Sequence, residues 1–515
     1  MYPGTYAATT PDKPAVIMAR SGTIVTYRQL NDESIRLARV LRSEGLGRGD
    51  RVAILMDNDA RYLTVCWAAQ RAGLVYVPVN WHLTASEMQY IVDNCEAKAL
   101  IANYASAAAA SELGRASATV RLALALDGPI VGFEDFDSVI ATQPGGELED
   151  EVEGADMIYS SGTTGRPKGG RRPLPDNHPR DLHPRLLKGF YGLFGFDEHS
   201  RYLTPGAPLY HGAPLRFSMA VTRYGGTNVI MDRFDAEEAL QAIEHHQVSH
   251  SQWVPTMFVR LLRLPADVRA RYDLSTHVSA IHAAAPCPVA VKDEMIAWWG
   301  PVIHEYYGGS EGGAITYLSS EEWLAHKGSV GRTIAGTIHI VDEDGRECAA
   351  NQTGVVYSEN GLPVEYFNDP DKTRDAHDAH GWVTIGDIGY LDDDGYLFLT
   401  DRKDHMIIAG GVNIYPQEAE EVLIGHPKVA DVAVFGVPNA DLGEEVKAVV
   451  ELIDPADASE ELAEELIRYC RDALASYKCP RSVEFEAELP RAPSGKLYKR
   501  RLRDRYWAGH ASRIL

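Results

Sequence analysis

Positive charge is scarce in this sequence of 515 residues. Its 50 lysine and arginine residues face 73 aspartate and glutamate residues, so the net charge is −23. A protein that binds long nucleic acid must neutralise many phosphates with excess basic side chains, and this composition therefore excludes a general DNA- or RNA-binding protein. A small anionic ligand in a local basic pocket stays compatible with it.

Long hydrophobic runs and paired cysteines are lacking as well. No run reaches the ~18 apolar residues of a membrane-spanning helix, and the opening MYPGTYAATT does not resemble a secretory signal. The six cysteines form no Cys-x-x-Cys pair, which argues against structural zinc, and they are too few for a disulfide scaffold. We therefore expect a cytoplasmic protein with free thiols and no membrane span.

The sequence does contain an alternation of β-rich and helical segments. Segments 22–26, 51–56 and 75–80 are typical of strands. An amphipathic helical run follows the first, beginning at a capping box formed by Thr26 and Gln29, and a second helical run follows 51–56. The alternation predicts an α/β fold whose large N-terminal domain has mixed and parallel sheets with packed helices.

A different pattern begins near residue 402. Strands at 429–437 and 446–453 and an acidic helix at 459–476 predict a small α+β unit. The Asp394-Gly395 pair between apolar runs predicts a hairpin just before it. We place the domain boundary at the end of that hairpin, so that the domains are 1–401 and 402–515.

The sharpest local feature is the run YSSGTTGRPKG at 159–169, which follows a predicted strand. Its glycines let backbone N–H groups approach an anion closely, and its hydroxyls and lysine add donors and charge. It is not a Walker A loop, because Lys168 stands between Pro167 and Gly169. The run predicts a triphosphate-binding loop, with a flexible surface loop as the alternative.

Five ordered motifs together resemble the acyl-adenylate-forming enzymes, a superfamily of acyl-CoA synthetases, peptide-synthetase adenylation domains and beetle luciferases. The loop at 159–169 is the first, and the others are YYGGSE at 306–311, WVTIGD at 382–387, DRKD at 401–404 with the glycine-rich segment after it, and PRAPSGK at 490–496. The resemblance spans nearly the whole chain.

The resemblance implies an acid–thiol ligase that uses ATP, Mg²⁺ and CoA. In such an enzyme a carboxylate attacks the α-phosphate of ATP, pyrophosphate leaves, and the CoA thiol then attacks the acyl-AMP. A stand-alone adenylating enzyme that loads a carrier protein is the alternative, although the chain contains no carrier domain. A non-catalytic nucleotide-binding relative is disfavoured by the intact Lys496, Glu311 and Asp387.

The resemblance also assigns the nucleotide contacts. Tyr307 stacks near adenine, and Asp387 and Arg402 contact the ribose. Ser310 contacts the α-phosphate, and Glu311 with Thr164 holds Mg²⁺. The residues that grip the pyrophosphate are Ser160, Ser161, Gly162, Thr163, Thr164, Gly165 and Lys168. Outside the motif context, Glu311 would be read as a surface carboxylate and Asp387 as a turn residue.

The same resemblance makes Lys496 the catalytic lysine, and Asp404 the hinge about which a mobile C-terminal domain rotates. Outside its motif, Lys496 would be one of many tail lysines. After rotation Gly411 would line the entry of the CoA arm, with a simple hairpin turn as the alternative reading. His211 matches a position that faces the substrate carboxylate, or it is a core histidine.

The acyl pocket is expected around small residues, namely Ala284, Gly309 and Gly312, with Trp253 either a wall or part of the core. Their size favours a roomy pocket for a bulky apolar acid, which leaves fatty, aryl and steroid-type acids open. The expected partners are this acid, ATP and CoA; the sequence leaves a homodimer open.

Two departures from the family pattern stand out. Pro173, Pro175, Pro179 and Pro184 should prevent a continuous helix after the phosphate loop, so segment 170–185 is predicted to be irregular, and its role is open. Ile385 and Ala492 replace usual threonines.

Basic residues concentrate in 166–188, with seven against two acids, and in 491–505, with seven against one. These are the blocks that contain Lys168 and Lys496.

Overall fold

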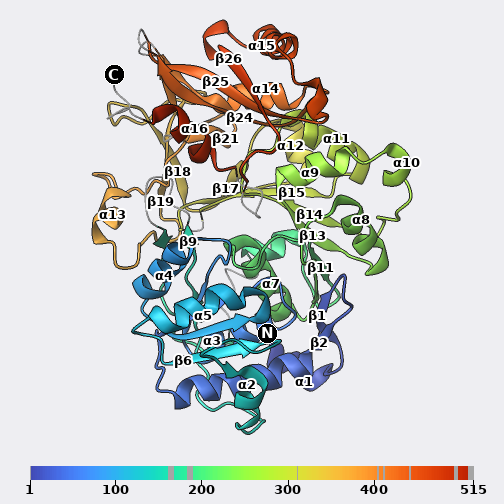
Figure 1. Ribbon diagram of the computed structural model, residues 1–515, viewed down its shortest axis with the longest axis vertical. Coiled ribbons are helices and arrows are strands. Elements are labelled where there is room, and N and C mark those ends of the chain that lie inside the picture. The colour runs from blue at the N-terminus through green and yellow to red at the C-terminus, as the bar shows by residue number, and fades with distance from the viewer. Residues whose placement is uncertain are drawn as a thin grey trace.

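The computed structural model describes residues 2–160, 167–181, 189–309, 311–402, 405–409, 412–439, 442–491 and 497–508. Three large sheets and their helices build the molecule (Figure 1). The first two sheets and the helices up to α13 form the larger part, and a C-terminal unit lies at one end of the long axis. This confirms the α/β fold class. The hinge motion and the boundary at residue 401 stay predictions.

The first sheet has six strands, all parallel to their neighbours. In spatial order they are β7 (Glu134–Asp135), β6 (Leu122–Leu126), β5 (Ala97–Asn103), β3 (Arg51–Leu55), β4 (Val75–Pro78) and β8 (Ala155–Asp156). The helices of this region are α1 (Pro3–Thr9), α2 (Tyr27–Ser43), α3 (Tyr62–Arg71), α4 (Ala85–Asn94), α5 (Ala107–Ala116) and α6 (Phe136–Ala141), with the short η1 (Tyr104–Ser106).

The second sheet has thirteen strands and combines a parallel centre with an antiparallel wing. Its order is β18 (Thr337–Val341), β19 (Gly354–Glu359), β20 (Asp387–Leu391), β21 (Tyr396–Arg402), β17 (Gly331–Ala335), β16 (Ile315–Leu318), β15 (Ile303–Tyr307), β14 (Ser279–His282), β13 (His250–Trp253), β11 (Arg201–Thr204), β12 (Thr227–Ile230), β1 (Pro14–Met18) and β2 (Ile24–Thr26). Strands β1, β12, β11, β13, β14 and β15 run parallel.

Seven α-helices of the described residues belong to this second region. They are α7 (Gly212–Tyr224), α8 (Ala236–His245), α9 (Pro255–Leu262), α10 (Ala266–Arg269), α11 (Val289–Trp299), α12 (Ser320–Ala325) and α13 (Pro370–Asp375), with the short η3 (Tyr191–Phe194). A small antiparallel hairpin of β9 (Tyr159–Ser160) and β10 (Lys168–Gly169) stands apart from the large sheets.

The C-terminal unit is built on a third sheet, of β23 (Val412–Ile414), β22 (Ile407–Ala409), β25 (Gly443–Leu452), β24 (Val429–Asn439) and β26 (Ser482–Glu486). Its helices are α14 (Pro416–Ile424), α15 (Glu460–Ala473) and α16 (Lys499–Trp507), with the short η4 (Pro455–Asp457) and η5 (Ser476–Lys478). The predicted strands at 429–437 and 446–453 and the predicted acidic helix are therefore confirmed, each within a few residues.

Local signals in the sequence explain several of these elements. The Thr26 side chain accepts from the Gln29 backbone and the Gln29 side chain accepts from the Thr26 backbone, so the predicted capping box begins α2. The Asp394-Gly395 turn joins β20 to β21, with Gly395 at a φ of +79°.

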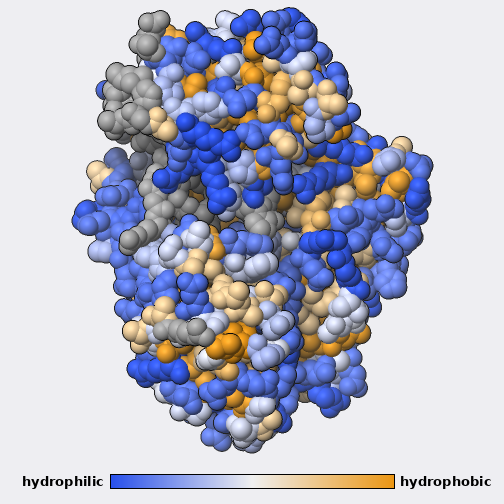
Figure 2. All heavy atoms as spheres, viewed as in Figure 1, coloured by the Kyte–Doolittle hydropathy of each residue, from blue (hydrophilic) through white to orange (hydrophobic). Residues whose placement is uncertain are grey.

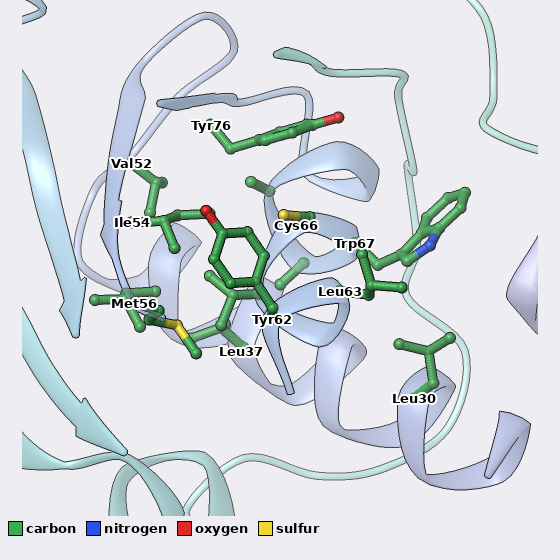
Figure 3. Close-up of a cluster of buried hydrophobic side chains, with 14 of the residues drawn as sticks. Leu30, Leu37, Val52, Ile54, Met56, Tyr62, Leu63, Cys66, Trp67 and Tyr76 are labelled. Atoms are coloured by element: carbon green, nitrogen blue, oxygen red, sulfur yellow. The ribbon is translucent and has the colours of Figure 1, made fainter. Parts of the chain in front are cut away.

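Helix α3 is buried along its whole length between other elements. Trp67, Leu63 and Cys66 of this helix pack in the core with Leu30 and with strand residues such as Ile54 (Figure 3). The Trp67 indole N–H also donates to the Thr222 hydroxyl at 2.9 Å. Burial of this many apolar side chains is the main stabilising contribution to the larger part of the molecule.

The surface is mostly hydrophilic on the face shown in Figure 2, as the acidic composition leads one to expect. Among the helices that the structure describes, none is both long enough and apolar enough to cross a bilayer. All six cysteines are free thiols.

A buried ion pair lies beneath the central strands of the large sheet. Lys292 of α11 is fully buried, and its Nζ donates to Glu305 Oε2 of β15 at 2.5 Å. His282 Nε2 of β14 lies 3.3 Å from the same oxygen. Burial alone would raise the pKa of Glu305, but His282 and Lys292 lower it to about 2. The carboxylate therefore stays charged where two parallel strands approach their carboxyl ends.

We expect Lys292→Met to lower the free energy of unfolding by about 3–5 kcal/mol, because it leaves the Glu305 carboxylate buried without its ammonium partner. Lys327→Met is the matched control, since Lys327 pairs with Asp293 at 2.7 Å on the surface and should cost less than about 1 kcal/mol. Urea denaturation of both variants measures the difference, and equal losses would contradict the assignment.

Candidate functional site

The predicted motifs meet at the carboxyl ends of the parallel strands in the large sheet. Strands β11, β13, β14 and β15 all run in one direction and end near one another. In open α/β sheets ligands bind in the crevice outside these strand ends. The loops that follow carry His211, Ala284 and the glycine-rich segment at 308–313, so three predicted parts of the site lie at this edge.

Two motifs far apart in sequence are joined by one hydrogen bond. The Tyr307 hydroxyl, at the end of β15, donates to Asp387 Oδ2, at the start of β20, over 2.7 Å. Asp387 is only 5% exposed. Gly309 also lies against the third motif, since a Cβ built on it would stand 3.0 Å from Ile385 Cδ1. The Ile385 departure therefore packs directly against the YYGGSE motif.

The β9–β10 hairpin is tied to the same region through the segment 361–367. Gly170 forms an isolated bridge with Tyr366, and the Phe367 N–H donates to the Gly169 carbonyl at 2.8 Å. Leu362 in turn bridges to Gly313, directly after the YYGGSE motif. Lys168, at the start of β10, places its Nζ 5.9 Å from the centre of the Tyr366 ring. One connecting segment thus joins the phosphate-loop hairpin to Gly313, two residues after Glu311.

His211 is held at the opening of α7. It occupies the N-cap position, its backbone N–H donates to the Pro208 carbonyl at 3.0 Å, and its side chain is half-buried. Asn58 fixes the loop before it, because its side chain donates to Ala207 and accepts from Leu209 N–H. Glu311 is also half-buried, between Gly309 and Gly312.

The C-terminal unit approaches this edge through the segment on either side of the PRAPSGK motif. Burial raises the pKa of the Tyr210 phenol, and the nearby Tyr498 raises it further. Arg491 pairs with Asp431 of β24, with Nη2 to Oδ1 at 2.6 Å, and bridges to Leu497. Tyr498, two residues after the motif, therefore lies near Tyr210, the residue that precedes His211, while Arg491 ties the start of the motif to β24.

Several predicted site residues cannot be placed by this structure. Outside the described residues lie Ser161, Gly162, Thr163, Thr164, Gly165, Ser310, Asp404, Gly411 and Lys496, and the side chains of Ser160 and Arg402 are not described either. Their roles stay predictions. The backbone of Arg402 does lie directly opposite Asp387 in the β20–β21 pairing.

The structure places Trp253 in the core, not in a pocket wall. Its side chain is 1% exposed, packs against Phe258 and Trp299, and donates to Ser251 Oγ at 2.5 Å. Side chains alternate along a strand, so Gln252 faces the opposite side, toward α7. Ala284, with a φ of +75°, is exposed at the end of β14, and its place in the acyl pocket stays a prediction.

Two features were missed from the sequence. One is a polar chain beneath the strand ends, in which the Tyr202 hydroxyl donates to Gln252 Oε1 at 2.8 Å. The other is a buried ion pair of Asp156 with Arg216, joined by Arg172 at 3.9 Å. Burial would raise the pKa of Asp156, but the two arginines lower it to about 2. The presence of Gln252, a polar residue in a buried strand, was the signal in the sequence that could have revealed the first of these features.

The Pro/Arg-rich segment is irregular over 171–181, as predicted, and it lies against buried acidic groups. Besides the contact between Arg172 and Asp156, the Pro179 carbonyl accepts from Arg223 at 2.8 Å, and the Asn177 carbonyl accepts from the Glu153 backbone N–H at 2.8 Å. The segment 171–181 therefore packs across α7 and the edge strand β8 of the six-stranded sheet, and it is held there by these contacts.

With the site in place, comparison with known proteins identifies the class. The chain belongs to the AMP-binding enzyme family, whose profile matches residues 5–361, and the profile of that family's C-terminal domain matches residues 418–496. The family resemblance drawn from the five motifs is thereby confirmed.

Among particular relatives, the chain is 33% identical over 507 residues to long-chain-fatty-acid–CoA ligase FadD13 of Mycobacterium tuberculosis, covering 98% of this chain and 97% of that protein. It is 31% identical over 519 residues to fatty acid–[acyl-carrier-protein] ligase ScoC of Streptomyces coeruleorubidus, covering 98% and 95%. Its fold matches amide bond synthetase McbA from Marinactinospora thermotolerans with a TM-score of 0.82 at 27% identity, covering 98% and 99%.

We expect Gly312→Ala to lower the free energy of unfolding by about 1–3 kcal/mol. Gly312 has a φ of +138°, and an added Cβ would stand 2.4 Å from the Pro363 carbonyl oxygen. Gly308→Ala is the control, because its nearest contact would be 3.6 Å away, to Ile315. Thermal unfolding of the two variants shows whether glycine is required at 312 by its φ and the close Pro363 carbonyl. An unchanged melting temperature for Gly312→Ala would contradict that requirement.

Proposed function

We propose that the chain is an ATP-dependent acyl-CoA synthetase that activates an apolar carboxylic acid through an acyl-AMP intermediate. The observation that carries this proposal is the junction of three motifs: Tyr307 bonds to Asp387, and segment 361–367 joins the phosphate-loop hairpin to the loop of Glu311. Membership of the AMP-binding enzyme family and the CoA ligases among its relatives support it.

The nucleotide would lie along this junction. Backbone N–H groups and hydroxyls of residues 160–165, with Lys168, would hold the phosphates. Asp387 is oriented by Tyr307, so its carboxylate would accept hydrogen bonds from ribose hydroxyls while Tyr307 packs against adenine. Arg402, opposite Asp387 on β21, would make a second ribose contact.

A divalent cation fits the site that these residues form. The half-buried Glu311 carboxylate is a hard oxygen ligand next to the phosphate region, and the Thr164 hydroxyl would be a second ligand. Mg²⁺ bound there would supply charge neutralisation on the phosphate oxygens. Ser310, which precedes Glu311 in the chain, would contact the α-phosphate.

The chemistry needs positive charge where negative charge develops. A carboxylate oxygen of the acid attacks the α-phosphorus, and the bond to pyrophosphate breaks. Lys496 would bridge the acid and the α-phosphate, and His211, at the start of α7, would position the acid. The CoA sulfur then attacks the acyl carbon, and AMP leaves with its bond to that carbon broken.

The two steps require different positions of the C-terminal unit. We propose that domain 402–515 rotates about Asp404 after adenylation, so that Lys496 leaves and the segment at Gly411 lines the path of the CoA arm. The described strands before and after that segment, β22 and β23, pair antiparallel, with Ala409 opposite Val412.

A carrier-protein ligase is the second candidate, because ScoC is named for loading a fatty acid onto an acyl-carrier protein and aligns along the whole chain. McbA, named an amide bond synthetase, is a reminder that the acceptor can differ on the same fold. Thioester formation with CoA, measured beside formation with a phosphopantetheinylated carrier protein, separates the candidates.

We expect Lys496→Ala to slow acid-dependent ATP–pyrophosphate exchange by about 10²–10³-fold, because it removes a preorganised charge from the adenylation step. Thioester formation from supplied acyl-AMP should be largely spared. Arg500→Ala is the control, since Arg500 is exposed and pairs with Asp504 at 3.2 Å. Equal loss in both half-reactions would contradict the rotation of the domain.

We expect Glu311→Ala to raise the Mg²⁺ concentration that gives half-maximal adenylation by at least about tenfold, because a carboxylate ligand is lost. Glu347→Ala, which removes an exposed carboxylate beside His339, should leave the metal response unchanged. Titration of Mg²⁺ at fixed ATP measures this, and an identical response in both variants would remove Glu311 from the metal site.

A further inference from the structure

At the carboxyl ends of β13 and β15, the side chains of Gln252 and Tyr306 point away from the contact between Tyr307 and Asp387. We call the surface that they form with the neighbouring aromatic rings the floor. On β15, Tyr307 points to Asp387, so its neighbour Tyr306 points to the opposite face, toward α7. On β13, Trp253 enters the core and Gln252 faces the same side as Tyr306. These two side chains therefore stand next to each other below the loops of His211 and Ala284.

Aromatic rings close this floor on its other sides. Phe190, Phe194 and Phe217 lie around the Tyr306 ring, with centroids 5.2, 6.4 and 5.8 Å from it. Phe194 and Phe217 are buried, whereas Tyr306 and Phe190 keep part of their surface exposed. Two of these contacts are edge-to-face and the one with Phe217 is tilted, and such contacts stabilise the cluster beyond the area they bury, so a long flexible chain would have to separate the rings.

The small residues above the floor do not enlarge the pocket. A Cβ at Gly312 would strike the Pro363 carbonyl, and one at Gly309 would stand 2.9 Å from the Gly312 carbonyl oxygen and 3.0 Å from Ile385. These glycines are required by close backbone approach, so the expectation of a bulky acid loses the argument on which it depended.

Hydrogen-bond donors at the floor are incompletely used. Gln252 is 4% exposed, and its Oε1 accepts from Tyr202. Its Nε2 has only a 3.5 Å contact with the Tyr306 oxygen, at the limit of a hydrogen bond. Within the described ranges no acceptor is found for the Tyr306 hydroxyl hydrogen. A buried amide donor with only this long contact, next to a partly exposed hydroxyl, favours a ligand that brings an acceptor.

We propose that Tyr306 and Gln252 select the acid: the substrate is a compact aryl carboxylic acid whose ring carries a hydrogen-bond acceptor at the end remote from the carboxylate. The ring packs on Phe190 and Phe217, and the acceptor receives hydrogen bonds from the Tyr306 hydroxyl and the Gln252 amide. This proposal rests on the proposed acyl-CoA synthetase function, and it makes Tyr306 a specificity-determining residue.

The test compares acids that differ in one property. In acid-dependent ATP–pyrophosphate exchange, 4-methoxybenzoate carries an acceptor that the isosteric 4-ethylbenzoate lacks, and dodecanoate tests chain length. We expect the unaltered enzyme to favour 4-methoxybenzoate over 4-ethylbenzoate by about tenfold in kcat/KM, and over dodecanoate by more.

Two substitutions at one position separate the hydroxyl from the ring. Tyr306→Phe keeps the ring, and it should reduce the preference for the methoxy acid to near unity. Tyr306→Ala opens the floor and should raise kcat/KM for dodecanoate relative to the aryl acids by at least about tenfold. Tyr317→Phe is the control. Tyr317 lies on β16 directly opposite Tyr306, and its hydroxyl forms a 2.8 Å hydrogen bond with His304.

The outcomes are distinct. A dodecanoate preference in the unaltered enzyme would overturn the proposed substrate class but leave the synthetase function intact. An unchanged methoxy-to-ethyl ratio in Tyr306→Phe would overturn the role of the hydroxyl. If no acid supports exchange, while a control ligase in the same assay is active, the proposed function itself fails.

Discussion

The alternation of side chains at the end of β15 is the constraint on which the site depends. Tyr307 turns to Asp387 and holds two distant motifs together at 2.7 Å, while Tyr306 turns the opposite way into an aromatic floor. One pleat therefore separates a proposed nucleotide side from a proposed acid side. The parallel strands β11 and β13 beside it end at the same edge, with Gln252 near the end of β13 and His211 in the loop after β11.

Two clusters of buried charged side chains lie next to the carboxyl ends of the parallel strands. Lys292, Glu305 and His282 lie under β14 and β15, and Asp156 with Arg216 and Arg172 lies against α7. Such pairs contribute little net stability compared with apolar packing, but each is costly to break. The first cluster joins α11 to β14 and β15, and the second joins α7 to β8. The irregular segment 171–181 is held by the second cluster through Arg172, and not by a helix of its own.

Much of the fold could be predicted from the sequence because local signals agreed with the tertiary structure. The capping box at Thr26, the Asp394-Gly395 turn and the strands of the C-terminal unit all lie where the pattern placed them. The site was predicted by motif, which gives identity but not orientation. The motifs therefore left Trp253 open between a pocket wall and the core, where the structure places it, and they gave Gln252 and Tyr306 no orientation, since only pairing and register determine which face a strand residue occupies.

The central claim is that a carboxylate oxygen of the acid attacks the α-phosphorus of ATP at this edge. An acid labelled with ¹⁸O in both carboxylate oxygens tests it directly, with mass spectrometry of the nucleotide and phosphate products after one turnover in the presence of CoA. The account predicts AMP that carries one ¹⁸O, because AMP leaves with the oxygen that formed the anhydride. Unlabelled nucleotide together with labelled inorganic phosphate would contradict it, because that result requires attack on the γ-phosphorus.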